Sequence, residues 1–198
     1  LYDIGSNRHI SVPNSLLIKK IRNTKNNNCL IVPEGTYYET KILFDFSYAM
    51  AKRYENWNFI LRTHPQVNMN KFLKKLYIFN RYEKLNNLFF SRKNFNDDLK
   101  DSKFLFYRGS TGAISGIMNG VTPIYVNLAK EKLNLDPMFE LKKFKLKIKK
   151  IDEFEKIVSN KKKNIREFKF ALNFCNKYFS LQTKNKTMSV FNQIINGN

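Results

Sequence analysis

Short apolar segments that stop abruptly at Gly, Pro or charged residues alternate with helical segments along this chain. The first, Cys29–Val32, ends at Pro33-Glu34-Gly35, and apolar residues then recur at helical spacing from Ile42 to Met50. Further strands are predicted at Trp57–Leu61, Leu88–Phe90, Phe104–Tyr107 and Val121–Val126, and further helices at Asn70–Phe79, Asn94–Asp101 and Thr111–Met118. Strands that alternate with helices at this spacing are typical of a parallel sheet with helices on both faces. The sequence therefore predicts a doubly wound α/β fold.

This pattern divides the chain into three parts. Residues 1–28 are polar and are predicted to be a linker or the end of a preceding domain, with the end of a strand at Leu1–Ile4 and a short helix near Ser15–Arg22. Residues 29–127 are predicted to form the α/β core, and residues 128–198 its helical C-terminal part. Helices are expected there at Ile151–Val158, Lys161–Phe179 and Thr187–Ile195. Because the first residue is Leu, we expect the chain to be a piece of a longer protein.

Two helix ends carry recognisable capping residues. Thr36 is predicted to cap the helix that follows Cys29–Val32, and Glu39, three residues later, to complete a capping box. Asn119-Gly120 is predicted to end the helix at Thr111–Met118, because Gly adopts the left-handed conformation of a C-terminal cap without strain.

The net charge of +20 favours partners that carry phosphate groups, namely nucleotides, nucleic acids or anionic lipid headgroups. A genomic bias toward lysine and asparagine would give the same excess without any ligand. Residues 141–170 hold 12 Lys or Arg and 4 Asp or Glu, a local excess of +8. That stretch is either a solvated helix face or, over Lys142–Lys163, a surface that contacts an anionic membrane.

The cysteines and the apolar runs indicate a cellular compartment. Cys29 and Cys175 lie far apart and have no His or Cys neighbours, which suits neither a zinc site nor a disulfide framework and fits a reducing cytoplasm. No apolar run approaches the roughly 20 residues that span a bilayer. We therefore expect a cytoplasmic protein, either free or bound peripherally at the inner membrane.

Polar motifs follow three of the predicted strands at the point where each strand ends. They are Pro33-Glu34-Gly35-Thr36, Arg62-Thr63-His64-Pro65 and Arg108-Gly109-Ser110-Thr111. Ligands of open parallel sheets bind beyond the carboxyl ends of the strands, so all three motifs are expected at one edge. This arrangement is also expected to bring His64 near Ser110.

The third motif has the features of a phosphate site. Gly109 lets the backbone approach a ligand closely, and Ser110 and Thr111 begin a helix whose free N–H groups favour an anion. An ordinary helix N-cap would use the same residue types, so this alternative stays open.

The other residues at this edge each have two or more interpretations. His64, held by Pro65, either donates a hydrogen bond to a phosphate oxygen or has a structural role. Arg62 either faces the ligand or pairs with a carboxylate. Glu34 acts as a base on an acceptor hydroxyl, hydrogen-bonds a ribose, or interacts with the dipole of the helix that starts at Thr36.

Taken together, these residues resemble bacterial glycosyltransferases of the GT-B fold that use CMP-activated acidic sugars. Bacterial sialyltransferases have an H-P motif and a later S-S/T motif, which here are His64-Pro65 and Ser110-Thr111. The order P-E-G, R-x-H-P, Y-R-G-S-T and N-G-V-x-P-I-Y over Cys29–Val126 is also similar to surface-polysaccharide enzymes related to Kdo transferases. The chain departs from the sialyltransferases at their D/E-D/E-G motif, which carries the general base and is matched here only by Pro33-Glu34-Gly35.

The resemblance implies that the chain is the C-terminal, Rossmann-like, donor-binding half of a GT-B enzyme, and that an N-terminal Rossmann-like domain is missing. The donor would be a CMP-linked acidic sugar, such as a sialic-acid-like sugar or Kdo, and the acceptor a glycan or a lipid-linked glycan of a capsule or lipopolysaccharide. Catalytic roles would fall to Glu34 and His64. Donor binding would involve Gly35, Thr36, Arg62, His64, Pro65, Arg108, Gly109, Ser110 and Thr111. No metal or other cofactor is expected, because a CMP leaving group carries one phosphate and no D-x-D pair lies near these motifs.

Three rival functions remain open. The first is a catalytically silent scaffold in a polysaccharide assembly complex. The second is a glycerophosphotransferase that uses CDP-glycerol, a class whose members also use H-P histidines. The third is a basic nucleic-acid-binding protein. No RNP, KH or zinc pattern is present, and the basic residues are spread widely. We therefore expect no nucleic-acid partner.

Overall fold

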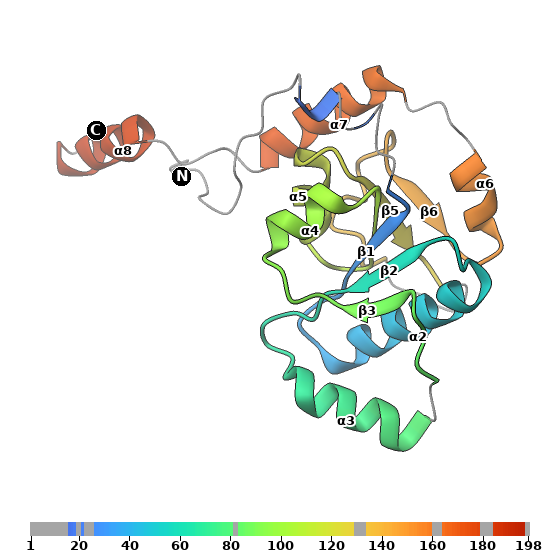
Figure 1. Cartoon of the computed structure of the whole chain (residues 1–198). Helices are drawn as coiled ribbons and strands as arrows, with labels where there is room; N and C mark the ends of the chain where they lie inside the picture. The colour runs from blue at the N-terminus through green and yellow to red at the C-terminus, as the bar shows by residue number, and fades with distance from the viewer. Residues whose placement is uncertain are drawn as a thin grey trace.

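The structure, a computed structural model, describes residues 16–18, 21, 26–80, 83–128, 134–159, 164–178 and 184–196. At its centre is a parallel six-stranded sheet in the order β3-β2-β1-β4-β5-β6 (Figure 1). The strands are β1 (Asn28–Val32), β2 (Asn58–Leu61), β3 (Leu88–Phe90), β4 (Phe104–Tyr107), β5 (Thr122–Val126) and β6 (Leu146–Ile148). The chain builds outward from β1 to β3, then crosses back and builds the other half from β4. This strand order confirms the predicted doubly wound α/β fold.

Helices cover both faces of this sheet. They are α2 (Tyr37–Arg53), α3 (Met69–Asn80), α4 (Phe95–Asp101), α5 (Gly112–Met118), α6 (Glu153–Ser159), α7 (Ile165–Tyr178) and α8 (Lys184–Ile195). Side chains of α2, α3 and α6 enter one core and those of α4, α5 and α7 the other. Helix α8 lies apart from the sheet (Figure 1). Within the described ranges, no helix is both long enough and apolar enough to cross a bilayer.

Each central strand contributes to both cores, because successive side chains of a strand point to opposite faces. In β4, Phe104 and Phe106 pack with α2 and α6, whereas Leu105 and Tyr107 pack with α5 and α7. All four side chains are buried, as expected for a parallel strand covered on both faces. This double coverage holds the strand ends, and therefore the polar motifs that follow them, in fixed positions.

The N-terminus of α2 follows only half of the predicted capping box. Thr36 is the N-cap, and its hydroxyl accepts a hydrogen bond from the backbone N–H of Glu39 at 3.2 Å. In a complete box the Glu39 carboxylate would reach back to the N-cap backbone. It binds the buried guanidinium of Arg108 instead, so this part of the prediction is wrong. A charged donor in a low-dielectric interior is the stronger partner for a carboxylate.

The C-terminus of α5 has the predicted cap. Gly120 adopts a left-handed φ of +71°, and its N–H donates to the carbonyl of Ile117 at 2.9 Å. Part of the predicted linker packs here, because Leu17 and Ile21 are buried in the core between the sheet and α5 and α7. These two residues therefore belong to this domain. The strand end predicted at Leu1–Ile4 lies outside the described residues.

Strand β6 was not predicted, because the segment after residue 127 was expected to be helical. It pairs parallel with β5 through the partners Ile124 and Leu146, Tyr125 and Lys147, and Val126 and Ile148. Residues 143–149 alternate lysine with Phe, Leu and Ile, which is the two-residue period of a strand with one buried face. The high local charge obscured this signal.

Candidate functional site

The three polar motifs lie at one edge of the sheet. Val32 pairs with Tyr107, and Ile31 pairs with Leu61, so β1, β2 and β4 end at nearly the same level. Because all three strands are parallel, the residues that follow them emerge on the same side. This confirms that the ends of these three strands share one edge. The β1 motif lies between the β2 motif, which contains His64, and the β4 motif, which contains Ser110.

Two glycines allow the three motifs to approach one another closely. A Cβ atom on Gly109 would lie 1.2 Å from Oε1 of Glu34, so the Glu34 carboxylate rests directly against the Gly109 backbone. A Cβ atom on Gly35 would lie 2.3 Å from Oε1 of Gln66 and 3.0 Å from Nδ1 of His64. We call these five residues, Glu34, Gly35, His64, Gln66 and Gly109, the edge cluster.

The ring of His64 is oriented by its own turn. Its Nδ1 accepts a hydrogen bond from the backbone N–H of Gln66 at 3.3 Å, and its carbonyl accepts one from Val67 at 2.8 Å. A neutral imidazole has one acceptor and one donor nitrogen, so Nε2 then carries the proton. Pro65 is exposed at the start of this turn. The half-buried His64 is thus arranged to present an N–H donor.

Glu34 lies in an electrostatic environment that favours its neutral form. Partial burial, and next the negative charge of Glu39, raise the pKa of its carboxyl group above the ordinary 4.5. Electrostatic interactions with Arg108, and next with His64, act in the opposite direction and are outweighed. A raised pKa makes a carboxylate a stronger base than an ordinary one, which suits it for proton transfer.

Replacement of Glu34 by glutamine is expected to stabilise the protein at neutral pH. As pH rises from below 4.5 through the raised pKa, the unfolded chain releases its proton first, so wild-type stability falls across this window. The glutamine variant lacks this loss, and its advantage in unfolding free energy is expected to grow with pH and then level off. Urea unfolding at several pH values measures the difference. Exposed Glu155 on α6, changed to glutamine, is the control. If the difference in unfolding free energy between the Glu34→Gln variant and the wild type does not vary with pH, the pKa of Glu34 is not raised in the folded protein.

Arg108 is directed into the protein rather than out of the edge. Its side chain is 1% exposed, and its Nε donates to Glu39 at 2.5 Å, while Nη1 donates to the carbonyl of Val126 at 3.3 Å. Glu39 comes from α2, Val126 is the last residue of β5, and Arg108 itself follows β4. The guanidinium therefore joins three elements next to the edge cluster. This geometry supports the backbone at Gly109.

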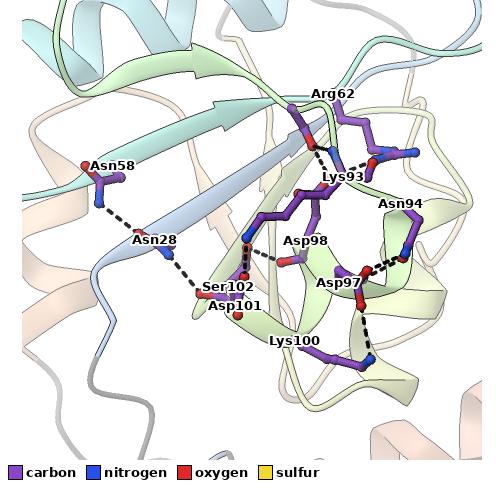
Figure 2. A network of polar contacts seen from close by, with 11 residues as sticks. Asn28, Asn58, Arg62, Lys93, Asn94, Asp97, Asp98, Lys100, Asp101 and Ser102 are labelled. Carbon is purple, nitrogen blue, oxygen red and sulfur yellow. Dashed lines mark hydrogen bonds and ion pairs between the residues drawn. The ribbon is translucent and has the colours of Figure 1, made fainter.

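Arg62 also binds a buried carboxylate. Its Nη1 donates to Asp98 of α4 at 2.8 Å and to the carbonyl of Lys93 at 2.6 Å, as Figure 2 shows. Asp98 is 2% exposed and also accepts a hydrogen bond from the hydroxyl of Ser91 at 2.6 Å. The guanidinium lies 5.4 Å from the ring centroid of Phe95. Of the two interpretations from sequence, the structure has Arg62 paired with a carboxylate.

The hydroxyl residues that follow the strands are differently placed. The Ser110 hydroxyl accepts from the N–H of Gly112 at 3.2 Å, and its oxygen therefore helps to start α5. Thr111 is exposed, has helical backbone angles, and forms no capping hydrogen bond through its side chain. Thr36 is occupied as the cap of α2. Of these three side chains, Thr111 is therefore the one best placed to meet a ligand, and the Ser110 hydroxyl can still donate its proton.

Three residues that shape this edge were missed by sequence reasoning. Gln66 contributes to the edge cluster, and Glu39 provides the partner of Arg108. The third is Asp136, which is 6% exposed and accepts hydrogen bonds from the hydroxyl of Tyr107 and the N–H of Met138, each at 2.9 Å. Because Tyr107 is the last residue of β4, this bond holds the segment around Asp136 beside the edge. Only Gln66 could have been found locally, since it follows His64-Pro65 directly.

One described cavity is lined by none of the residues of the edge cluster. A cavity of about 740 Å³ lies between α2, α3 and β3, and is lined by residues that include Phe44, Leu73 and Phe89. Across the part of the chain that the structure describes, no three His, Cys, Asp or Glu side chains gather into a group that could hold a metal ion.

No protein-family model matches the chain, and no curated protein sequence matches it. Solved structures that resemble it include the glycotransferase of kitacinnamycin, with a TM-score of 0.52, 11% identity, and coverage of 84% of this chain and 43% of that one. A β-Kdo 2,4 transferase (KpsC) from Thermosulfurimonas dismutans has a TM-score of 0.43 at 14% identity, with 84% and 48% coverage. A UDP-GlcNAc 2-epimerase from Methanocaldococcus jannaschii has a TM-score of 0.49 at 14% identity, and the match covers 76% of this chain and 43% of the epimerase.

The strand order and the first of these likenesses define the class of the fold. It is a Rossmann-like α/β domain that matches one half of a GT-B protein. The chain spans less than half of the length of each of these three proteins.

Proposed function

We propose that this chain is the donor-binding part of a glycosyltransferase that uses a nucleotide-activated sugar. The observation that carries the proposal is the edge cluster, where a partly buried carboxyl group, an imidazole and two close-packed glycines meet beyond three parallel strands. Ligands of doubly wound sheets bind at this edge, near the point where the strand order reverses. Here that point lies between β1 and β4, and Glu34 and Gly109 follow those two strands.

In this proposal the donor phosphate lies beside Gly109, where His64 Nε2, the Ser110 and Thr111 hydroxyls and backbone N–H groups donate to its oxygens. Gly35 and Thr36 form the wall on the β1 side. The charge on a nucleotide leaving group grows as the sugar departs, so these donors bind the transition state more tightly than the ground state. Glu34 takes the proton of the acceptor hydroxyl, for which its raised pKa suits it.

Arg62 and Arg108 have an indirect part in this scheme. Their guanidinium groups are bound to Asp98 and Glu39, so they maintain the frame of the edge and add positive charge near it. No metal ion enters the proposal, because a CMP leaving group carries only one phosphate, whose oxygens would accept hydrogen bonds from His64 Nε2 and the other donors of this edge.

The finer assignment follows the motif order. We propose a CMP-linked acidic sugar as the donor, because His64-Pro65 and Ser110-Thr111 resemble the paired motifs of CMP-sugar enzymes. The acceptor would be a glycan or lipid-linked glycan of a surface polysaccharide, and a second Rossmann-like domain would close over the edge.

The test is stabilisation of the chain by nucleotides. CMP at 100 times its dissociation constant is expected to raise the unfolding free energy by about 2.7 kcal/mol. UDP and a single-stranded oligonucleotide are expected to do less at equal concentration. His64→Ala, which removes a proposed donor, is expected to abolish most of the CMP effect. The matched control is Tyr38→Ala, an exposed residue on the first turn of α2.

Each rival function has its own outcome in this experiment. A clear preference for UDP assigns the domain to UDP-sugar enzymes, and stronger stabilisation by CDP-glycerol than by CMP assigns it to the glycerophosphotransferase type. Stabilisation by the oligonucleotide alone supports nucleic-acid binding. No effect of any nucleotide on the complete protein supports the silent scaffold.

A further inference from the structure

The outer surface of α7 and the turn before β6 combine exposed phenylalanines with exposed basic residues. Phe139 is 56% exposed and Phe170 is 52% exposed, although Phe side chains are usually buried. The exposed basic residues around them come from two adjoining segments. We call the six residues Phe139, Lys142, Lys143, Arg166, Lys169 and Phe170 the α7 surface.

Several contacts join these residues into one surface. The Lys142 ammonium donates to the carbonyl of Phe139 at 3.2 Å, and the Lys143 ammonium lies 6.0 Å from the ring centroid of Phe170. Beneath them Phe144 packs on Phe168, with ring centroids 5.1 Å apart, so the turn is fixed against α7. On α7 itself, residues 166, 169 and 170 have the spacing of a single helix face. In Figure 1, α7 lies on the outside of its layer.

This composition fits the headgroup region of an anionic bilayer. Ammonium and guanidinium groups attract anionic lipids, while an exposed phenylalanine ring gains by entering the boundary between headgroups and acyl chains. Glu140 and Glu167 lie next to these residues and reduce the local positive charge. The aromatic rings therefore have to contribute to binding alongside the charges.

The surface differs from the one expected from sequence, which was the whole of Lys142–Lys163. Lys145 is not available, because its ammonium is bound to Asp136 and to the carbonyl of Met138, and its side chain is 13% exposed. Residues 160–163 lie outside the described residues. The structure also adds Arg166, Lys169 and Phe170 of α7, which lie beyond Lys163.

We propose that the α7 surface binds peripherally to membranes that contain anionic lipids, with Phe139 and Phe170 entering the headgroup layer. This property is separate from the nucleotide site, since it involves a helix face outside the core formed by α5 and α7 and none of the residues of the edge cluster.

Co-sedimentation with phosphatidylcholine vesicles of increasing phosphatidylglycerol content, at low and at physiological salt, tests the proposal. Binding is expected to rise with phosphatidylglycerol and to fall with salt. Changing Lys142, Lys143, Arg166 and Lys169 to glutamine is expected to weaken binding by about fivefold for each charge at low salt. Phe139→Ser with Phe170→Ser is expected to weaken it at least about tenfold, and equally at both salt concentrations.

A charge-matched control removes four lysines from the opposite side of the sheet. Lys71, Lys74, Lys84 and Lys156 are exposed on or beside α3, α2 and α6, and their replacement by glutamine is expected to leave binding nearly unchanged. Equal losses in the control and in the α7 variant overturn the proposal, because net charge alone then accounts for binding. Unaltered binding of the double serine variant also overturns it, as does tighter binding to single-stranded RNA that the vesicles do not displace. Thermal unfolding verifies that each variant is folded.

Discussion

Arg108→Met is expected to lower the free energy of unfolding by about 3–5 kcal/mol, the largest stability effect of any single change proposed for this chain. The substitution leaves Glu39 as an unpaired charge at a site where its side chain is 9% exposed. It also removes the hydrogen bond to the carbonyl of Val126. Urea unfolding followed by circular dichroism measures the loss, and an unchanged slope against urea confirms that both proteins unfold in the same way.

The double variant Arg108→Met with Glu39→Leu separates the effect of an unpaired charge from the value of the ion pair. Replacing both partners of a buried pair by apolar groups is often nearly neutral, so the double variant is expected to recover most of the lost stability. Glu39→Leu alone is expected to be strongly destabilising, because it leaves the buried guanidinium of Arg108 without its carboxylate partner. Additive losses in the double variant contradict this account and indicate that Arg108 acts through packing alone.

The same pair shows where sequence reasoning reached its limit. Glu39 stands three residues after Thr36, and by local spacing alone it is the second residue of a capping box. Its actual partner is 69 residues away, and the two meet only because β1 and β4 are adjacent in the sheet. Spacing along the chain contains no information about that adjacency. The local half of the prediction, the Thr36 hydroxyl as N-cap, was therefore confirmed, and the long-range half was wrong.

The strands and helices of the core were predictable for a physical reason. Strands buried on both faces are short apolar runs that stop where a turn residue or a charged residue appears. Their boundaries can therefore be predicted from the neighbouring residues alone. The helix predicted at Asn94–Asp101 is α4, with Asn94 as its cap. Strand β6 follows a different rule, because it lies at the edge of the sheet. Lys147 stays exposed while Ile148 is buried, and composition therefore pointed to a solvated helix.

The edge of the sheet was predictable, whereas the contacts made there were not. Parallel strands that end in polar motifs place those motifs together whatever their side chains are. The identity of the touching atoms depends on rotamers and on backbone approach. Arg62 and Arg108, both plausible phosphate ligands by sequence, are directed to Asp98 and Glu39. The close approach of Glu34 to Gly109 appears only in three dimensions.

Gly109→Ala is expected to lower the affinity for CMP by about tenfold or more, which corresponds to the loss of one charge-assisted hydrogen bond at about 1.5–3 kcal/mol. The added methyl group would lie 1.2 Å from Oε1 of Glu34 and has to displace that carboxylate. It also stands where the proposed phosphate approaches the backbone. Backbone strain does not contribute, because the described residues with positive φ are Phe144 and Gly120. Calorimetry with CMP measures the affinity.

Glu34→Ala, alone and combined with Gly109→Ala, separates the two effects of the methyl group. Truncation of Glu34 removes the atoms that collide with the added methyl group, so any stability lost in the single Gly109 variant is expected to return in the double variant. Affinity for CMP is expected to stay low in the double variant, because the methyl group still blocks the phosphate. If the affinity for CMP returns together with stability, Gly109 serves only to make room for the Glu34 side chain. The proposed position of the phosphate beside the Gly109 backbone is then wrong. If neither single variant changes CMP binding, the nucleotide lies elsewhere on the domain.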